Sequence, residues 1–339
     1  MGVFTYSLSK SKLICLLAIL LASIVFLTAC GDDGTESNNE DKEQGQAESE
    51  DQSATESEDV REISHAMGDT TIEGTPKRIV TLYQGATDTI VAFDVKPVGA
   101  VESWLQQPTY EYLSEDLEGV EIVGTETQPN LEEIAKLNPD LIIASALRHE
   151  EIYDQLTEIA PTVAHETVFD FKGTVELMGE AINQEEKANE LLTAWDDRVK
   201  DFQGKVTEKL GDEWPKNVSI LNFRADHARI YFTGFAGSIL AELGFTRPEN
   251  QQSDEWGIQL TDKESIPEMN ADVFYIFNEE DPAVEQTFEE WKNHPLWDNL
   301  DAVKNDQVYM VDEIIWNMGG GIKAANLMLD DIYDRFELE

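Results

Sequence analysis

The chain has 339 residues, with 69 Asp or Glu against 24 Lys or Arg and a formal net charge of −45 at pH 7. Phosphate recognition needs clustered basic side chains, so this balance excludes nucleic acid as the expected partner. We interpret the surplus of carboxylates as an adaptation of an exported protein to salt or alkali, where charged groups keep the surface hydrated.

The first 29 residues have the order of a secretory signal peptide. A start with two lysines and no acid precedes an apolar run over 13–29, which closes on Leu27-Thr28-Ala29-Cys30. A membrane-spanning helix is the alternative, but 17 residues are at the short limit for about 30 Å of hydrocarbon. The box resembles the lipobox of bacterial lipoproteins, which implies that Cys30 is acylated and becomes the mature N-terminus. We therefore expect a signal peptide over 1–29 and a lipid anchor on the extracellular face of the cytoplasmic membrane.

Residues 30–60 are predicted to form a disordered acidic tether. From residue 31 to residue 60 the chain has 12 Asp or Glu, one Lys and no aromatic residue. Such a segment buries too little apolar surface to offset the entropy of ordering. The other cysteine, Cys15, lies in the segment to be removed, so the mature chain is expected to have no disulfide. The remainder is long enough for two modest domains or one large one.

An amino-terminal lobe is predicted over 61–172, where short β-rich runs alternate with helical stretches. Strands are expected at 78–82, 97–101, 121–124, 140–144 and 162–164, and helices at 87–93, 130–137 and 150–159. Alternation of this kind predicts an α/β unit with a largely parallel sheet.

A single long helix is predicted over 173–210. Its apolar residues recur mostly in steps of three and four, which is the helical period: Val175, Met178, Ile182, Ala188, Leu191, Leu192, Trp195, Val199, Phe202 and Val206. At ~1.5 Å per residue, this helix would run for about 50 Å or more.

A second lobe is predicted over 211–339, with strands at 217–223, 228–232, 271–277 and 307–311 and helices at 237–243, 264–269, 289–293 and from about 321. The two lobes also repeat a pattern. In both 131–140 and 263–272 a helical segment with an early glutamate is followed by Asn-x-Asp and a buried strand. Aligning Glu132 with Glu264 places the apolar residues in register, which indicates pseudo-symmetric lobes.

These features together resemble the substrate-binding lipoproteins of iron-siderophore ABC importers. The motifs that carry the resemblance include Thr75-Pro76-Lys77-Arg78-Ile79-Val80, Leu137-Asn138-Pro139-Asp140 and Phe235-Ala236-Gly237-Ser238, and it extends over about residues 61–337. Residues 222–227 (Asn-Phe-Arg-Ala-Asp-His) and 315–317 (Ile-Trp-Asn) are similar to Gram-positive receptors for citrate-based carboxylate or hydroxamate siderophores.

The resemblance implies an α/β fold of two Rossmann-like lobes joined by one long helix. It implies an extracellular, monomeric solute-binding component of an ABC importer, which captures an anionic ferric siderophore between its lobes and delivers it to the permease subunits. The siderophore would supply the iron ligands, so neither a cofactor nor a direct metal site is expected. Haem, vitamin B12 and a bare metal ion are alternative ligands.

A secreted hydrolase is the alternative from another functional class. The sequence has no Gly-x-Ser-x-Gly elbow, no glycine-rich phosphate loop and no His-Glu-x-x-His motif. Its five histidines show no zinc-ligand spacing. We therefore expect a binding protein rather than an enzyme.

Candidate ligand-binding residues follow the predicted strands, since ligands of open α/β sheets lie beyond the carboxyl ends of the strands. Arg148 and His149 follow strand 140–144, and Arg224, His227 and Arg229 follow strand 217–223. Arginine suits an anionic ligand because its planar guanidinium pairs two carboxylate oxygens at once. A surface ion pair is the alternative in so acidic a chain. Further candidates for the cleft are Gln84, Trp104, Tyr231, Trp316, Asn317 and Lys323.

Glu132 and Glu264 are candidates for docking to the permease. In the family that the chain resembles, one acid on each lobe enters a basic pocket of a permease subunit, and both residues match that place. The alternative is an ordinary glutamate in the first turn of a helix, where a negative charge interacts favourably with the helix dipole.

Overall fold

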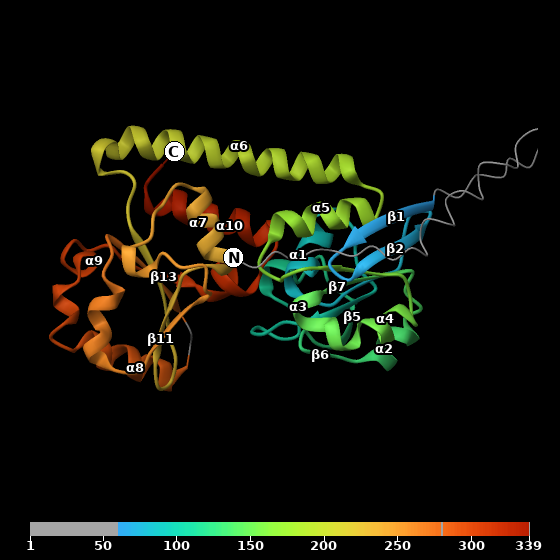
Figure 1. The fold of residues 1–339 in the computed structure, drawn as a ribbon, viewed down its shortest axis with the longest axis horizontal. Helices are drawn as coiled ribbons and strands as arrows, with labels where there is room; N and C mark the ends of the chain where they lie inside the picture. Colours follow the sequence, from blue (N-terminus) through green and yellow to red (C-terminus); the bar gives the residue numbers. More distant parts are fainter. Residues whose placement is uncertain (1–59, 279–280, 339) are drawn as a thin grey trace, which may run out of the picture. The chain divides into compact units, whose positions relative to one another are not determined.

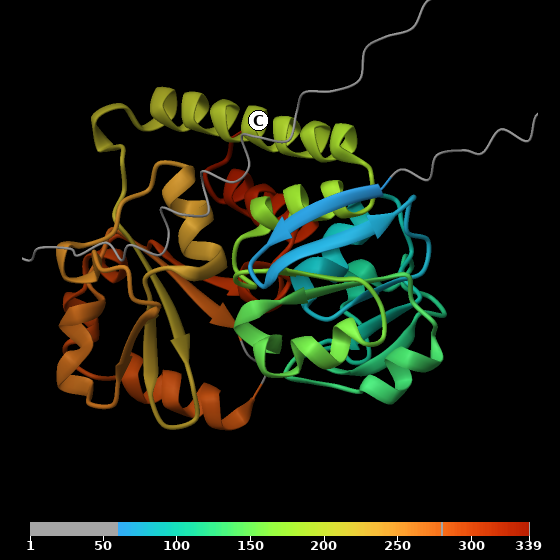
Figure 2. The same ribbon diagram turned by 45° about the vertical axis from the view of Figure 1, so that its right-hand side comes forward.

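The computed structural model describes residues 60–278 and 281–338. The predicted signal peptide, the acylation site Cys30 and nearly all of the predicted tether lie outside these ranges. Over the described ranges, none of the helices has the length and apolar character needed to cross a bilayer. These residues form two α/β lobes, and the long helix α6 (Glu185–Leu210) runs along both of them (Figures 1 and 2).

The amino-terminal lobe has a six-stranded sheet in the order β6-β5-β4-β3-β7-β8, in which every neighbouring pair is parallel except β5 and β6. The strands are β3 (Ile79–Thr81), β4 (Gly99–Glu102), β5 (Glu121–Thr125), β6 (Gln128–Pro129), β7 (Leu141–Ser145) and β8 (Thr162–His165). The helices include α1 (Gln84–Ala92), α2 (Leu131–Lys136), α3 (Ala146–His149) and α4 (Tyr153–Thr157). The predicted parallel sheet is confirmed. The helix expected over 150–159 begins with a 3₁₀ turn, Glu150–Ile152, and is α-helical only in α4.

An antiparallel hairpin of β1 (Val60–His65) and β2 (Gly68–Glu73) precedes this sheet, and the sequence reasoning did not find it. Its backbone lies against the edge strand β8: the N–H of Ala66 donates to the oxygen of Ala164 at 3.0 Å, and Thr70 Oγ1 donates to the oxygen of Thr162 at 2.8 Å. An uncovered edge strand presents unpaired peptide groups. The hairpin therefore shields the outer edge of the sheet.

The carboxy-terminal lobe has a mixed five-stranded sheet in the order β11-β10-β9-β12-β13, with β9, β12 and β13 parallel. Its strands are β9 (Val218–Phe223), β10 (Ala228–Tyr231), β11 (Gly257–Leu260), β12 (Val273–Asn278) and β13 (Val308–Asp312), and its helices include α7 (Gly234–Glu242), α8 (Pro282–Lys292), α9 (Asp301–Lys304) and α10 (Ile322–Arg335). Segment η5 (Lys263–Met269) is a 3₁₀ helix that contains Pro267. A π-helical turn, η7 (Ile314–Met318), leads from β13 to α10.

The prediction of one unbroken helix over 173–210 is wrong. The segment forms two helices, α5 (Phe171–Ala181) and α6, which are separated at Asn183, a residue with φ of 58°. Asparagine adopts this left-handed conformation more readily than most residues. A Cβ on Gly179 of α5 would lie 2.6 Å from the Cβ of Ala188 on α6, so the missing side chain allows the two helices to pack closely. Helix α6 has 26 residues and is about 39 Å long.

The core follows the alternation of side chains along the strands. In β7, Leu141 and Ile143 enter one apolar cluster, whereas Ile142 and Ala144 enter another on the opposite face. The first cluster also contains side chains of α1, α5, α6, α7, α10 and the second sheet. One continuous apolar cluster therefore runs through both lobes beneath the helices, and each sheet has a separate cluster on its other face.

Candidate functional site

A pocket of about 390 Å³ lies between the lobes, at the carboxyl ends of their strands. Its amino-terminal side is lined by Gln84, Gly85, Trp104, Glu126, Arg148, Val168 and Phe169, and its carboxy-terminal side by Arg224, Arg229, Tyr231, Asn317, Met318 and Gly320. Seven of the candidates drawn from the sequence therefore meet in one place. Two larger hollows, of about 610 and 540 Å³, lie elsewhere and receive no residue from the first lobe's sheet.

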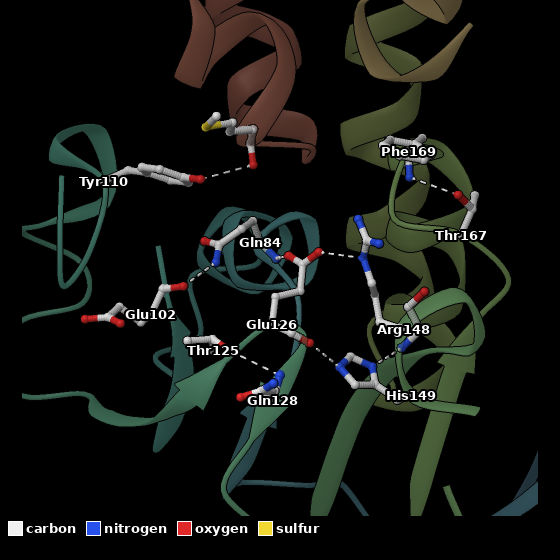
Figure 3. A network of polar contacts seen from close by, with 12 residues as sticks. Gln84, Glu102, Tyr110, Thr125, Glu126, Gln128, Arg148, His149, Thr167 and Phe169 are labelled. Carbon is white, nitrogen blue, oxygen red and sulfur yellow. Dashed lines mark hydrogen bonds and ion pairs between the residues drawn. The ribbon is translucent and has the colours of Figure 1, made fainter. Parts of the chain in front are cut away.

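Arg148 and Glu126 form an ion pair on the amino-terminal side (Figure 3). Arg148 Nε donates to Glu126 Oε1 at 3.1 Å, and the backbone N–H of Gln84 donates to Glu126 Oε2 at 3.1 Å. Gln84 is held in turn, because its Nε2 donates to the oxygen of Glu102 at 2.9 Å. Glu126 is 3% exposed. Burial raises the pKa of its carboxyl, and the donors Gln84 and Arg148 offset part of that rise.

His149 supports this pair from behind rather than facing the pocket. It is 1% exposed, its Nδ1 accepts from the N–H of Ser145 at 3.1 Å, and its Nε2 lies 2.8 Å from the backbone oxygen of Glu126. The first contact makes Nδ1 the acceptor, so Nε2 carries the proton and donates it. Burial lowers the pKa of the imidazole, which favours this neutral form. His149 therefore does not line the pocket.

A second arginine–glutamate pair lies on the carboxy-terminal side. Arg224 Nη2 is 3.2 Å from Glu313 Oε1, and Asn222 Nδ2 donates to the same oxygen at 3.4 Å. The side chain of Glu313 is 1% exposed and that of Arg224 is 25% exposed. Each lobe thus places a buried carboxylate behind an arginine of the pocket.

Arg229 is oriented by a chain of polar contacts. Its Nε donates to His227 Nε2 at 3.0 Å, and His227 Nδ1 lies 2.6 Å from Asp226 Oδ1. Its guanidinium also lies 5.9 Å from the ring centre of Trp256, which is 52% exposed and packs 5.7 Å from Tyr231. His227 is buried behind Arg229 and does not line the pocket. His227 orients the side chain of Arg229 and does not form part of the pocket wall.

Two other candidates lie away from the pocket. Trp316 is fully buried, donates from Nε1 to Asp331 at 2.9 Å and packs 4.5 Å from the ring of Tyr275, so it belongs to the core and does not line the pocket. Lys323 pairs with Asp116 at 2.9 Å and borders a different pocket of about 340 Å³. Its position at the start of the last helix was predicted, but this helix packs on α1 rather than on the cleft.

Several residues of the pocket were not found from the sequence. Glu126 follows β5, but one more acid carries little signal in a chain with 69 of them. Phe169 is 39% exposed beside the arginines. Gly85 and Gly320 bring the backbones of the two lobes together, since a Cβ on Gly85 would lie 2.6 Å from the oxygen of Gly320. Two glycines that lie far apart in the sequence give no sign that their backbones are in contact.

Glu132 and Glu264 are exposed and stand apart from the pocket, each at the start of a helical segment. The N–H of Glu132 donates to the capping side chain of Asn130 at 3.1 Å, and that of Glu264 donates to the capping side chain of Asp262 at 3.0 Å. These equivalent caps match the internal repeat in the sequence and place the two glutamates at corresponding points of the two lobes.

The chain matches the periplasmic binding protein family over residues 79–314. It is 45% identical over 260 residues to the achromobactin-binding periplasmic protein of Dickeya dadantii, which covers 76% of this chain and 85% of that protein. It is 42% identical over 337 residues to the "Probable siderophore-binding lipoprotein YfiY" of Bacillus subtilis, covering 96% of this chain and 98% of that protein. The crystal structure of Staphylococcus aureus SirA complexed with staphyloferrin B superposes with a TM-score of 0.79 at 52% identity, over 82% of this chain and 99% of SirA.

Proposed function

The chain belongs to the periplasmic binding protein family, and we propose that it captures an anionic ferric siderophore of the carboxylate type in the pocket between its lobes. The observation that carries this proposal is the meeting of Arg148, Arg224 and Arg229 from both lobes. In a chain with a net charge of −45, three guanidinium groups at one place run against the overall composition. They favour an anionic ligand because an arginine pairs two carboxylate oxygens in one plane.

The other residues of the pocket suit the same ligand. Trp104, Phe169 and Tyr231 supply aromatic surface, and Gln84 and Asn317 supply amide groups for hydrogen bonds. The names of two relatives refer to achromobactin and to a siderophore, and SirA was solved with staphyloferrin B. In this proposal the siderophore supplies the iron ligands.

Delivery to an ABC permease forms the second part of the proposal. Glu132 and Glu264 would each enter a basic pocket on one permease subunit, since both are exposed at equivalent points of the lobes. Acylation at Cys30 would hold the protein on the extracellular face of the cytoplasmic membrane. The relatives named as lipoproteins support this anchorage.

Titration calorimetry of the purified protein tests the capture step. The ferric complexes of staphyloferrin B and achromobactin should bind more tightly than an uncharged ferric trihydroxamate. Arg224→Ala should weaken the binding of the anionic complexes by about tenfold to hundredfold, because it removes a charge-assisted contact. Arg198→Ala is the matched control: this arginine pairs with Asp330 on α10, outside the pocket, and its loss should leave the affinity unchanged. Unchanged affinity in Arg224→Ala would refute the basic pocket.

A further inference from the structure

Glu126 places a carboxylate in a pocket proposed to hold an anion. This carboxylate disfavours binding of the anion unless it has a structural role that compensates for the repulsion. Its side chain is 4% exposed and borders the pocket directly. A buried carboxylate near an anionic ligand repels it, and burial of the charge is itself costly. An ion pair with Arg148 on the exposed surface would incur neither the repulsion of the ligand nor the cost of burying the carboxylate. The position of Glu126 therefore needs an explanation beyond charge balance.

Its two carboxylate oxygens accept from different donors, and the side chain of Trp104 is a further hydrogen-bond partner of the carboxylate. Oε1 accepts from Arg148 Nε, and Oε2 accepts from the N–H of Gln84 at the start of α1. The backbone oxygen of Glu126 accepts from His149, which follows Arg148 in the chain. Glu126 lies directly after β5 and accepts hydrogen bonds from Gln84 at the start of α1 and from His149 at the end of α3 (Figure 3). These contacts hold Glu126 in place beside Arg148.

The use of Nε determines which edge of Arg148 remains available. A guanidinium pairs with a carboxylate either through Nε and one Nη or through both Nη groups. Glu126 occupies Nε, and within the part of the chain that the structure describes Arg148 makes no hydrogen bond through Nη1 or Nη2. Figure 3 shows this end of Arg148 projecting beyond the Glu126 carboxylate. A ligand in the pocket can therefore form hydrogen bonds with Nη1 and Nη2 of Arg148.

We propose that Glu126 is a positioning residue that fixes Arg148 through Nε and presents its two Nη groups to a carboxylate of the bound siderophore. This inference rests on the function proposed above and deepens it. Fixing the side chain before binding reduces the rotamer freedom that is lost on binding. It also favours a planar acceptor with two oxygens over a ligand with one. The other lobe also pairs an arginine of the pocket with a buried glutamate, since Arg224 Nη2 lies 3.2 Å from Glu313 Oε1.

A carboxylate is needed at residue 126 because only it can accept from both donors. An amide has one acceptor oxygen, so Glu126→Gln directs an NH₂ group at either Arg148 Nε or the N–H of Gln84. The variant keeps the size of the side chain and removes one of the two contacts. It should loosen Arg148 while leaving the surrounding strands in place.

A double-mutant cycle tests the inference, with the ferric complex of staphyloferrin B as the probe and titration calorimetry as the readout. Arg148→Ala should weaken binding by about tenfold to hundredfold, and Glu126→Gln by about threefold to tenfold. If Glu126 acts through Arg148, adding Glu126→Gln to Arg148→Ala should change the affinity by less than about twofold. Full additivity, or an unchanged affinity in Glu126→Gln alone, would overturn the proposal. Thermal melting of each variant controls for the fold.

Arg148→Lys keeps the test decisive even if Glu126→Gln does not fold. Lysine retains the charge but has a single ammonium group, so it cannot satisfy Glu126 and present a planar pair of donors at once. It should lose nearly as much affinity as Arg148→Ala, and retention of wild-type affinity would show that charge alone is sufficient. Failure of the wild-type protein to bind any anionic ferric siderophore would instead refute the proposed function.

Discussion

Asp88 gives a stability prediction that follows from one buried carboxyl group. It lies on α1, is fully buried, and accepts from the N–H groups of Lys323 and Ala324 at the start of α10, at 2.8 and 2.9 Å. Tyr112 donates its hydroxyl to the same carboxylate at 2.9 Å. Burial raises the pKa of Asp88 from its usual 3.8 to about 6, in spite of these donors and of the Lys323 charge.

The direction of the pH effect follows from this raised pKa. Protonation is easier in the folded state than in the unfolded state, so the folded protein gains stability from Asp88 as the pH falls. The contribution is complete below about pH 3.8 and is lost as the pH rises through about 6. A shift of about two units corresponds to ~3 kcal/mol in total. About 1.4 kcal/mol of it should develop between pH 8 and pH 5.

Urea unfolding followed by circular dichroism measures this contribution if wild type is compared with Asp88→Asn at fixed ionic strength. The range from pH 8 to pH 5 stays above the sequence isoelectric point of about 4.2. Titration of the other acids is common to both proteins and largely cancels in the difference. The free energy of unfolding of the wild type, relative to the variant, should rise by about 1.4 kcal/mol on acidification to pH 5. A constant or falling difference would show that the three donors outweigh burial.

Three further outcomes are expected. Trp195→Phe should lower the free energy of unfolding by about 1–3 kcal/mol in urea titrations. The reason is that the buried indole donates to Glu242 at 3.1 Å and packs 5.0 Å from Phe171. A change under ~0.5 kcal/mol would contradict this expectation. The double variant Glu132→Ala, Glu264→Ala should bind ferric staphyloferrin B normally but support less iron uptake by cells, since it loses a docking charge on each lobe; normal uptake would refute docking. Ferric staphyloferrin B at a thousandfold excess over Kd should stabilise the protein by ~4 kcal/mol in thermal melting, whereas Fe³⁺ or Zn²⁺ alone should not; stabilisation by the bare ion would favour a direct metal site.

The fold was largely predictable because strands and helices leave different periods in the sequence. Leu141 to Ala144 are all apolar, as expected for a strand with both faces covered, and the structure places alternate residues in two clusters. The break at Asn183 was not predictable in this way, because the apolar residues Met178 and Ile182 continue the helical period up to it. A single residue with positive φ changes the direction of the chain without changing the pattern.

The site was predictable to the extent that its residues are rare in this chain. Arginines are few, and Arg148 and Arg224 each follow a predicted strand, so both could be placed at one edge of a sheet. Trp316 follows β13 in the same way, but the π-helical turn directs its ring into the core. The direction of a side chain after a strand depends on the loop that follows. Period and composition do not contain that information.

The attachment of α10 has a consequence for how the protein is synthesised. This last helix follows the second sheet in the chain, yet Asp88 of the first lobe caps its start, and its side chains Met328 and Leu329 enter the apolar cluster that both lobes share. Many multidomain chains fold one domain at a time from the amino terminus during translation. Here the first lobe cannot complete its core until residues 322–335 have left the ribosome. A fragment that ends at residue 210 would lack this helix, so the two lobes are not independent folding units even though each has its own sheet.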